Sequence, residues 1–158
     1  QKLSEDFIRE FQDKVTWGCI SKYQTLSEEF RNEFKIEIPK NNWLYTSNEE
    51  KMKAIKGCEL YKLDGEYVIA YKGIRSDNYS AFNFQYKYEL GETCDSHCDY
   101  NNENENSFGL SAWTLDKARE YCSQKIIKVK IHISDIGALV HDCHKIRCSR
   151  MTVLEEVE

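Results

Sequence analysis

Two short runs of the sequence combine cysteine and histidine in the way that a zinc site requires. HDCHKIRC spans residues 141–148 and CDSHCDY spans residues 94–100, and together they hold four of the seven cysteines and three of the four histidines. Zinc takes four cysteine or histidine ligands in tetrahedral geometry, usually from closely spaced pairs. The candidate ligands are Cys94, His97, Cys98, Cys143 and His144. A small zinc-stabilised domain is therefore one hypothesis.

A different interpretation of the second run needs no metal. If KIRC is a strand, Ile146 and Cys148 share one face and Lys145 and Arg147 the other, because side chains alternate along a strand. Cys148 is then a small buried apolar residue, and HDCH is a polar turn that leads into the strand. The spacing of the cysteines and histidines also departs from the common zinc knuckle. We therefore favour a polar loop with a buried thiol, and expect no cofactor.

Composition limits the classes of protein that the chain can belong to. Its 158 residues are enough for one ordinary domain, or a small domain with a helical extension. A net charge of -5 argues against broad binding to nucleic acid or anionic membranes, and no apolar run reaches the ~18 residues of a membrane span. An odd number of irregularly placed cysteines favours reduced thiols, so we expect a cytoplasmic protein. The chain begins at Gln1, which suggests a fragment of something longer.

The N-terminal third contains an internal repeat. QKLSEDFIREF at residues 1–11 returns as QTLSEEFRNEF at residues 24–34, a shift of 23 residues. In each copy a serine, Ser4 or Ser27, stands where a helix N-cap would, and apolar residues follow at helical spacing. TWGCISKY at residues 16–23 adds a second short helix. Such a helical pair cannot bury its own apolar stripe and must stack on a neighbour, so the two copies resemble the end of a longer array.

The rest of the chain changes from helical to alternating patterns. A helix over TSNEEKMKAIKGC is expected to begin at Ser47 and to end at Gly57. The remaining expected elements are a strand at 66–74, a half-exposed strand at 82–90, a polar loop at 92–107, a strand over SFGLSAW, a helix capped by Thr114 with Leu115, Ala118 and Tyr121 inward, a strand over KIIKVKIHI and a final strand over KIRCSRMTVL. This order predicts an α+β protein. We divide it into a helical repeat segment at 1–58 and an α+β module at 59–158, mostly antiparallel with one interleaved helix.

Several segments of the second part carry a family resemblance. YKGIRSDNYSAFNFQYKYELGE, a cysteine-bearing loop, FGLSAWTLDKAREYC, KIIKVKIHISDIGALV and KIRCSRMTVLEE follow in that order. They resemble an uncharacterised module scattered through tailed phages and giant DNA viruses, and the LSEEF repeat resembles repeated helical segments of mimivirus-type proteins. The resemblance implies a viral or phage-like protein of the host cytoplasm. That module has no established activity from which a function could be transferred. Ser111 stands where the module often has a histidine.

The same strands are similar, more distantly, to the skeleton of ADP-ribosyltransferases. In that family a His-Gly or Arg-Gly strand holds NAD, a second strand leads into a helix, and a late glutamate activates the ribose. Carried over, Lys72 takes the place of the histidine or arginine, Ser111 that of a tyrosine or serine, and Glu156, Glu155 or Glu158 that of the glutamate. Lysine lacks the planar fork of arginine, and serine cannot stack on nicotinamide. The resemblance thus implies an NAD-binding enzyme or an inactive relative of one.

Basic residues gather in the last two long strands. Lys128, Lys130, Lys145 and Arg147 would form a basic strip if they shared the outer face of a sheet, and such a strip could bind a phosphate backbone. The competing interpretation, which we favour, is a solvated sheet face, because outward residues of antiparallel sheets are usually charged. Nucleic acid is therefore a possible partner but not the expected one.

These patterns favour a binding or interaction module over an enzyme. Helical repeats present extended surfaces, so a protein partner is expected to bind through them. The chain contains no Gly-rich phosphate loop, paired-carboxylate signature or HExxH motif. The two alternatives are the NAD-binding enzyme and the zinc-stabilised domain.

Overall fold

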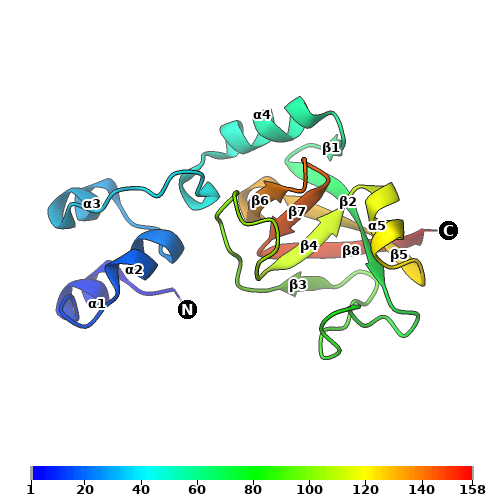
Figure 1. Ribbon diagram of the computed structural model, residues 1–158, viewed down its shortest axis with the longest axis horizontal. Coiled ribbons are helices and arrows are strands. Elements are labelled where there is room, and N and C mark those ends of the chain that lie inside the picture. Colours follow the sequence, from blue (N-terminus) through cyan, green and yellow to red (C-terminus); the bar gives the residue numbers. More distant parts are fainter. Residues whose placement is uncertain (1, 158) are drawn as a thin grey trace.

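The protein is described by a computed structural model that covers residues 2–157, in which short helices precede one antiparallel sheet (Figure 1). The elements are α1 (Glu5–Glu10), α2 (Trp17–Tyr23), α3 (Glu28–Phe34), the 3-10 turn η1 (Trp43–Tyr45), α4 (Asn48–Cys58), β1 (Lys62–Asp64), β2 (Tyr67–Ile74), β3 (Thr93–Asp95), β4 (Leu110–Trp113), α5 (Leu115–Tyr121), β5 (Lys125–His132), the 3-10 turn η2 (Ile133–Asp135), β6 (Ile136–Val140), β7 (Lys145–Cys148) and β8 (Arg150–Val157). Helices α1 to α3 form a group apart from the sheet. The predicted α+β class, with helices first, is confirmed.

Helices α1 and α3 begin in the same way, as the sequence repeat predicts. Ser4 Oγ accepts a hydrogen bond from the Phe7 amide at 3.2 Å, and Ser27 Oγ accepts one from the Phe30 amide at 3.1 Å. Such caps satisfy amides that the helix itself leaves unpaired. Ile8 of α1 and Phe30 of α3 are fully buried in one small apolar core. The two copies therefore cover each other, and we call residues 2–36 the helical unit.

The sheet is antiparallel at each of its strand pairs. Its order is β3-β8-β5-β2-β4-β7-β6, with β1 paired to one end of β2. Partners in a ladder point to the same face: Ala70 and Val129 pair on the face that carries the main core, and Tyr71 and Lys128 pair on the opposite face. Ile55 of α4 also joins this core, although α4 falls in the first part of the division made from the sequence.

The interleaved helix α5 lies against β2 and β4, as expected, but differs from the prediction in two details (Figure 1). Thr114 does not cap the helix through its side chain; its Oγ1 lies 3.2 Å from His144 Nδ1 instead. Ala118 is buried, whereas Tyr121, predicted to point inward, is 42% exposed. Tyr121 lies at the end of α5, where the Phe82 ring stacks on it at 5.4 Å.

The strand predicted at 82–90 is wrong. Residues 75–91 form an irregular loop, in which Phe82 is 77% exposed. Short polar side chains explain this outcome, because Ser80 Oγ accepts from the Asn83 amide at 3.3 Å and Asn83 Oδ1 accepts from the Gln85 amide at 3.1 Å. Local hydrogen bonds of this type compete with a strand ladder. The alternation of aromatic residues at 82–90 therefore does not indicate a strand.

Several elements also differ from the sequence prediction. The single strand predicted over KIRCSRMTVL is two strands, β7 and β8, which are not neighbours in the sheet. β3 forms inside the expected loop 92–107, where it pairs with β8. β6, which was not predicted as a separate strand, is an apolar run buried along its whole length. Helix α4 continues past Gly57, and it ends because Glu59 takes a left-handed φ of 56°.

Side-chain hydrogen bonds attach the helical unit to the sheet. Asn42 Nδ2 donates to the carbonyl of Lys22 at 3.1 Å, and the Tyr45 hydroxyl lies 3.0 Å from the carbonyl of Ser21. The Trp43 amide following Asn42 donates to the carbonyl of Tyr100 at 2.8 Å. The segment around η1 is therefore tied both to the end of α2 and to the loop that precedes β4.

Candidate binding site

Two of the three residues suggested by the transferase resemblance lie in one row of the sheet, whereas the Ser111 side chain faces the other side, because Trp113 of the same strand pairs with Tyr71 and not with Lys72. Lys72 Nζ on β2 donates to the carbonyl of Ser111 on β4 at 2.7 Å. Ile127 of β5 pairs with Lys72 on one side and with Glu156 of β8 on the other, so Lys72 and Glu156 belong to one row across the sheet. The neighbouring Glu155 pairs with Lys128 on the opposite face. Glu158, the third candidate acid, lies outside the described residues.

Lys72 is nevertheless enclosed by its own chain. Its side chain points into the main core, where its Nζ lies 5.1 Å from the centre of the Tyr88 ring. Burial lowers the pKa of Lys72 to about 8, because a charged amine loses its hydration there. The Tyr88 ring, itself buried, occupies the space over the amine. Protein atoms therefore fill the space over the Lys72 amine that a bound nicotinamide would need.

We expect the pH dependence of the unfolding free energy to reveal the lowered pKa of Lys72 when the native chain is compared with Lys72→Met. The ordinary pKa of the amine is 10.5 and the folded value about 8, so between these pH values the unfolded chain binds more protons. Stability then rises with pH across this window. The native chain should gain up to about 3 kcal/mol relative to Lys72→Met between pH 8 and 10.5.

Urea unfolding at successive pH values measures this gain. Subtracting the unfolding free energy of Lys72→Met from that of the native chain removes the contribution of the thiols and tyrosines, because both chains contain them. A difference that stays constant from pH 8 to 10.5 would show that the Lys72 amine titrates normally.

The four residues of the predicted basic strip are not brought together on the surface. Lys128 Nζ on β5 pairs with Glu155 Oε1 at 2.8 Å, and Lys130 Nζ lies 5.0 Å from the centre of the Tyr67 ring. Lys145 and Arg147 lie on β7, which β2 and β4 separate from β5, and both are buried. The structure therefore separates the four into a half-buried pair and a buried pair.

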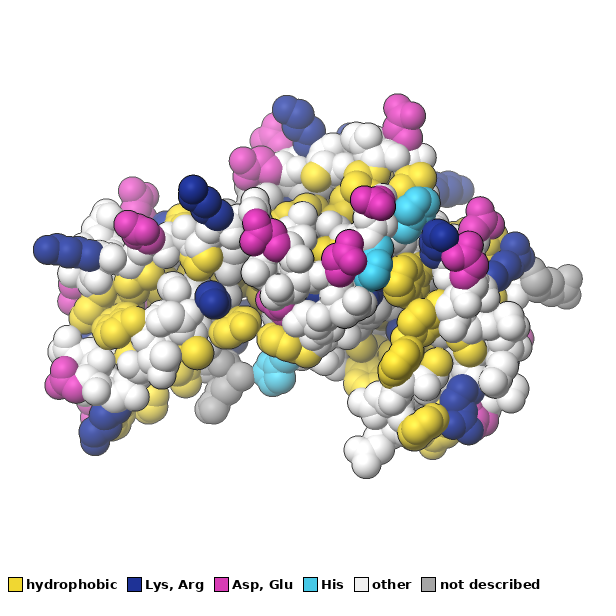
Figure 2. All heavy atoms as spheres, in the orientation of Figure 1, with side chains coloured by type: hydrophobic (Ala, Val, Ile, Leu, Met, Phe, Trp, Pro, Cys, Tyr) yellow, Lys and Arg dark blue, Asp and Glu magenta, His cyan; other side chains and the backbone are white. Residues whose placement is uncertain are grey.

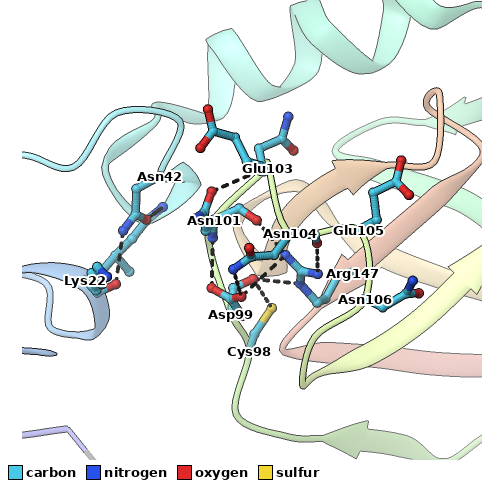
Figure 3. A network of polar contacts seen from close by, with 12 residues as sticks. Lys22, Asn42, Cys98, Asp99, Asn101, Glu103, Asn104, Glu105, Asn106 and Arg147 are labelled. Atoms are coloured by element: carbon cyan, nitrogen blue, oxygen red, sulfur yellow. Dashed lines mark hydrogen bonds and ion pairs between the residues drawn. The ribbon is translucent and has the colours of Figure 1, made fainter.

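Arg147 organises the polar loop that the sequence predicted at 92–107 (Figure 3). Its Nε donates to the carbonyl of Asp99 at 2.8 Å, its Nη1 to that of Asn104 at 2.7 Å and its Nη2 to that of Asn101 at 2.7 Å. Lys145 Nζ donates to the carbonyl of Glu105 at 3.1 Å. The loop is thus a fixed cover over one face of β7. A fully buried arginine was not expected here, because alternation alone places Arg147 outward.

Asp99 is itself part of this loop, and its carboxylate binds other residues of the loop (Figure 3). Its Oδ2 accepts from Asn104 Nδ2 at 2.9 Å, and its Oδ1 accepts from the Asn101 amide at 3.0 Å. Burial raises the pKa of Asp99, but the hydrogen bonds and Arg147 outweigh it, so that the pKa is lowered on balance. The frequent asparagines of this loop therefore have a structural use, since their amides and carbonyls are its internal partners.

The candidate zinc ligands are dispersed. Cys94 points into the main core, Cys98 packs against Gly137, Cys143 lies in the turn between β6 and β7, and His144 contacts Thr114. Within residues 2–157 no three cysteine, histidine or acidic side chains form a group that could hold a metal ion. Burial also raises the pKa of Cys98 to about 12, so its thiol is protonated at neutral pH in this structure. A zinc site built from these residues stays a prediction that this geometry does not support.

The predicted turn and buried thiol are confirmed. His141, Asp142 and Cys143 take left-handed φ values of 53°, 50° and 69°, a conformation that residues other than glycine rarely adopt. Cys148 is fully buried. HDCH is therefore a tight turn, as its polar sequence indicated, and KIRC is the strand that follows.

A cleft of about 880 Å³ opens where the helical unit meets the sheet, and we call it the junction cleft. Figure 2 shows the surface at this junction between the two lobes of the molecule. The lining residues are Lys2, Tyr23, Gln24, Asp95, Ser96, His97, Cys98, Tyr100, Phe108, Asp135, Ser149 and Arg150. Only Cys98 and His97 among them were candidates from the sequence. Asp95, Ser96 and Tyr100 belong to the same short run as these two, but the remaining lining residues come from distant parts of the chain, so no local pattern could have grouped the whole set.

The walls of the junction cleft combine aromatic rings with charges of both signs. The rings of Tyr23 and Phe108 lie 5.9 Å apart, and both side chains are exposed. Arg150 Nε contacts Asp95 Oδ1 at 2.5 Å, and both members of this ion pair remain largely exposed. Asp135 adds a second carboxylate. Such walls suit a ligand that has apolar surface and both kinds of charge, and they disfavour a polyanion.

Comparisons with known proteins identify no relative. No protein-family model matches the chain, and neither the curated proteins nor the solved structures give a significant match. Within the described residues, no helix has the length and apolar character needed to cross a bilayer. The assignment of a function therefore rests on the geometry of the chain itself.

Proposed function

We propose that the chain is a binding module that holds an extended segment of a partner protein in the junction cleft. One observation carries the proposal: the cleft is lined from both the helical unit and the sheet. Binding sites occur preferentially at such junctions, and a volume of this size accommodates several amino-acid residues. The candidate catalytic lysine, by contrast, is engaged with the carbonyl of Ser111.

The chemistry of the cleft favours a polypeptide over the other ligand classes. Aromatic side chains and arginine are the residues that contribute most to protein interfaces, and the cleft offers Tyr23, Phe108 and Arg150. β3 is the first strand of the sheet order, so among the described residues its outer edge pairs with no other strand, and the Tyr86 hydroxyl donates to the carbonyl of Asp95. An extended segment could run along this edge, as in other cases of strand addition.

Selection of binders from a random peptide library on the full chain tests the proposal. An enriched peptide is then titrated by fluorescence anisotropy against the native chain, Tyr23→Ala and Arg150→Glu. Each cleft variant should weaken binding about tenfold or more, as loss of an interface anchor does.

The matched control is Lys128→Glu. Lys128, like Arg150, is a cation in a surface ion pair of the sheet, but it lies outside the cleft. Its affinity for the peptide should equal that of the native chain. The proposal fails if no peptide is enriched, or if the selected peptides bind the cleft variants as tightly as the native chain.

The second candidate is an NAD-binding relative of the ADP-ribosyltransferases. The cross-sheet row of Lys72, Ile127 and Glu156 favours it, although the Lys72 amine meets the backbone carbonyl of Ser111 and not its hydroxyl. The buried Tyr88 ring over Lys72 opposes it. Thermal stabilisation of the chain by millimolar NAD, abolished in Lys72→Ala, would favour this candidate over the first.

A further inference from the structure

The contact between α1 and α3 joins two copies of the same sequence repeat. Glu5 of the first copy accepts hydrogen bonds from the amide of Ser27, at 2.5 Å, and from its Oγ, at 3.1 Å. Arg9 Nη2 pairs with Glu33 Oε2 at 3.0 Å, and its guanidinium lies 4.8 Å from the centre of the Phe30 ring. The first copy therefore recognises the second through a glutamate and an arginine that flank a buried core.

The face of α3 that receives these contacts has an equivalent on α1. A shift of 23 residues converts Leu26, Phe30 and Phe34 into Leu3, Phe7 and Phe11. Phe30 is completely buried, whereas Phe7 is 44% exposed. The difference arises because α3 has α1 packed on it, while nothing described covers the same position of α1.

The rim of this face is equivalent as well. Ser4 and Glu10 stand at the positions of Ser27 and Glu33 after the same shift, and both are exposed. The rings of Phe7 and Phe11 lie 4.7 Å apart, so they present one continuous apolar surface. We call the surface of Ser4, Phe7, Glu10 and Phe11 the α1 face, whereas Leu3 packs against the core of the helical unit.

We infer that the α1 face is a docking surface for a helix of the same repeat type, one that carries the pattern Glu-x-x-Ile-Arg. This pattern is that of Glu5, Ile8 and Arg9, whose side chains cover the equivalent face of α3. The arriving glutamate binds Ser4, the isoleucine packs beside Phe7, and the arginine pairs with Glu10. In stacked repeats each unit contacts only its neighbours, so one interface continues into the next. The inference does not depend on the junction cleft.

A chain with an added repeat tests the inference. Residues 1–23 are placed a second time ahead of the full chain, which puts the added glutamate, isoleucine and arginine one repeat step from the α1 face. Hydrogen exchange of the α1 amides is followed in both chains. The added copy should slow this exchange about tenfold or more, because a docked neighbour suppresses local opening of α1.

The matched control is the same extension with Ile8→Asp and Arg9→Glu in the added copy only, which should leave the α1 exchange unchanged. In the correctly extended chain, Phe7→Ala should restore the fast exchange. The inference is overturned if the native extension does not slow the α1 amides, or if the altered extension slows them equally. It is also overturned if the chain without extension forms a dimer that Phe7→Asp dissociates, since a second copy then occupies the face.

Discussion

Replacing Arg147 with methionine is expected to lower the free energy of unfolding by about 3 to 5 kcal/mol. The guanidinium is fully buried and donates to three carbonyls of the loop over β7, those of Asp99, Asn101 and Asn104. Methionine fills a similar volume but donates nothing, so the buried carbonyl of Asp99 loses its partner at about 1 to 3 kcal/mol, and the part-buried carbonyls of Asn101 and Asn104 lose theirs at a smaller cost. Part of this cost is recovered if water enters the loop. Equilibrium unfolding in urea measures the change.

Arg150→Met is the matched control, because Arg150 is three residues further along the chain and pairs with Asp95 at the surface. Exposed pairs contribute between about 0 and 1 kcal/mol. The control should therefore unfold almost like the native chain. A loss below about 1 kcal/mol in Arg147→Met would mean that the loop is held by contacts other than the guanidinium.

The elements that the sequence predicts correctly are those with strong local signals. Ser47 begins α4 with a complete capping box, in which Glu50 reaches back to the cap. The alternation of KIIKVKIHI identifies β5, and its inward and outward residues fall as expected. Cys148 was placed in the core by the same reasoning. In these segments the backbone preference and the burial pattern agree, which is the condition under which local sequence is decisive.

Local alternation fails where a distant segment changes the environment. Lys145 and Arg147 occupy the face predicted for solvent, but the loop at 92–107 covers them, and its carbonyls replace water as acceptors. Only the fold brings this loop to β7, so the charge pattern alone placed both residues on a solvated face. The FNFQYKYEL segment fails for the opposite reason, since its own Asn83 side chain stabilises a turn. The junction cleft could not be predicted, because its walls come from parts of the chain that meet only after folding.

A second large effect is expected at Gly73, where α5 crosses β2 without room for a side chain. A Cβ at this position would lie 2.4 Å from the carbonyl oxygen of Cys122 and 2.6 Å from that of Ala118. Both atoms belong to the backbone, so neither can turn aside as a flexible side chain could. Gly73→Ala should therefore push α5 away from the sheet and destabilise the chain by about 3 kcal/mol, the upper part of the usual cost of overpacking. Urea unfolding again provides the measurement.

Gly57→Ala separates this steric effect from the general effect of adding a methyl group. Gly57 lies near the end of α4, with no atom within 4 Å of the position that its Cβ would take. Alanine restricts the unfolded chain more than glycine does, so this variant should be more stable by about 0.5 kcal/mol. The opposite signs follow from the space around each residue, since the substitution is chemically the same. If Gly73→Ala unfolds at the same urea concentration as the native chain, the close approach of α5 to β2 is incorrect.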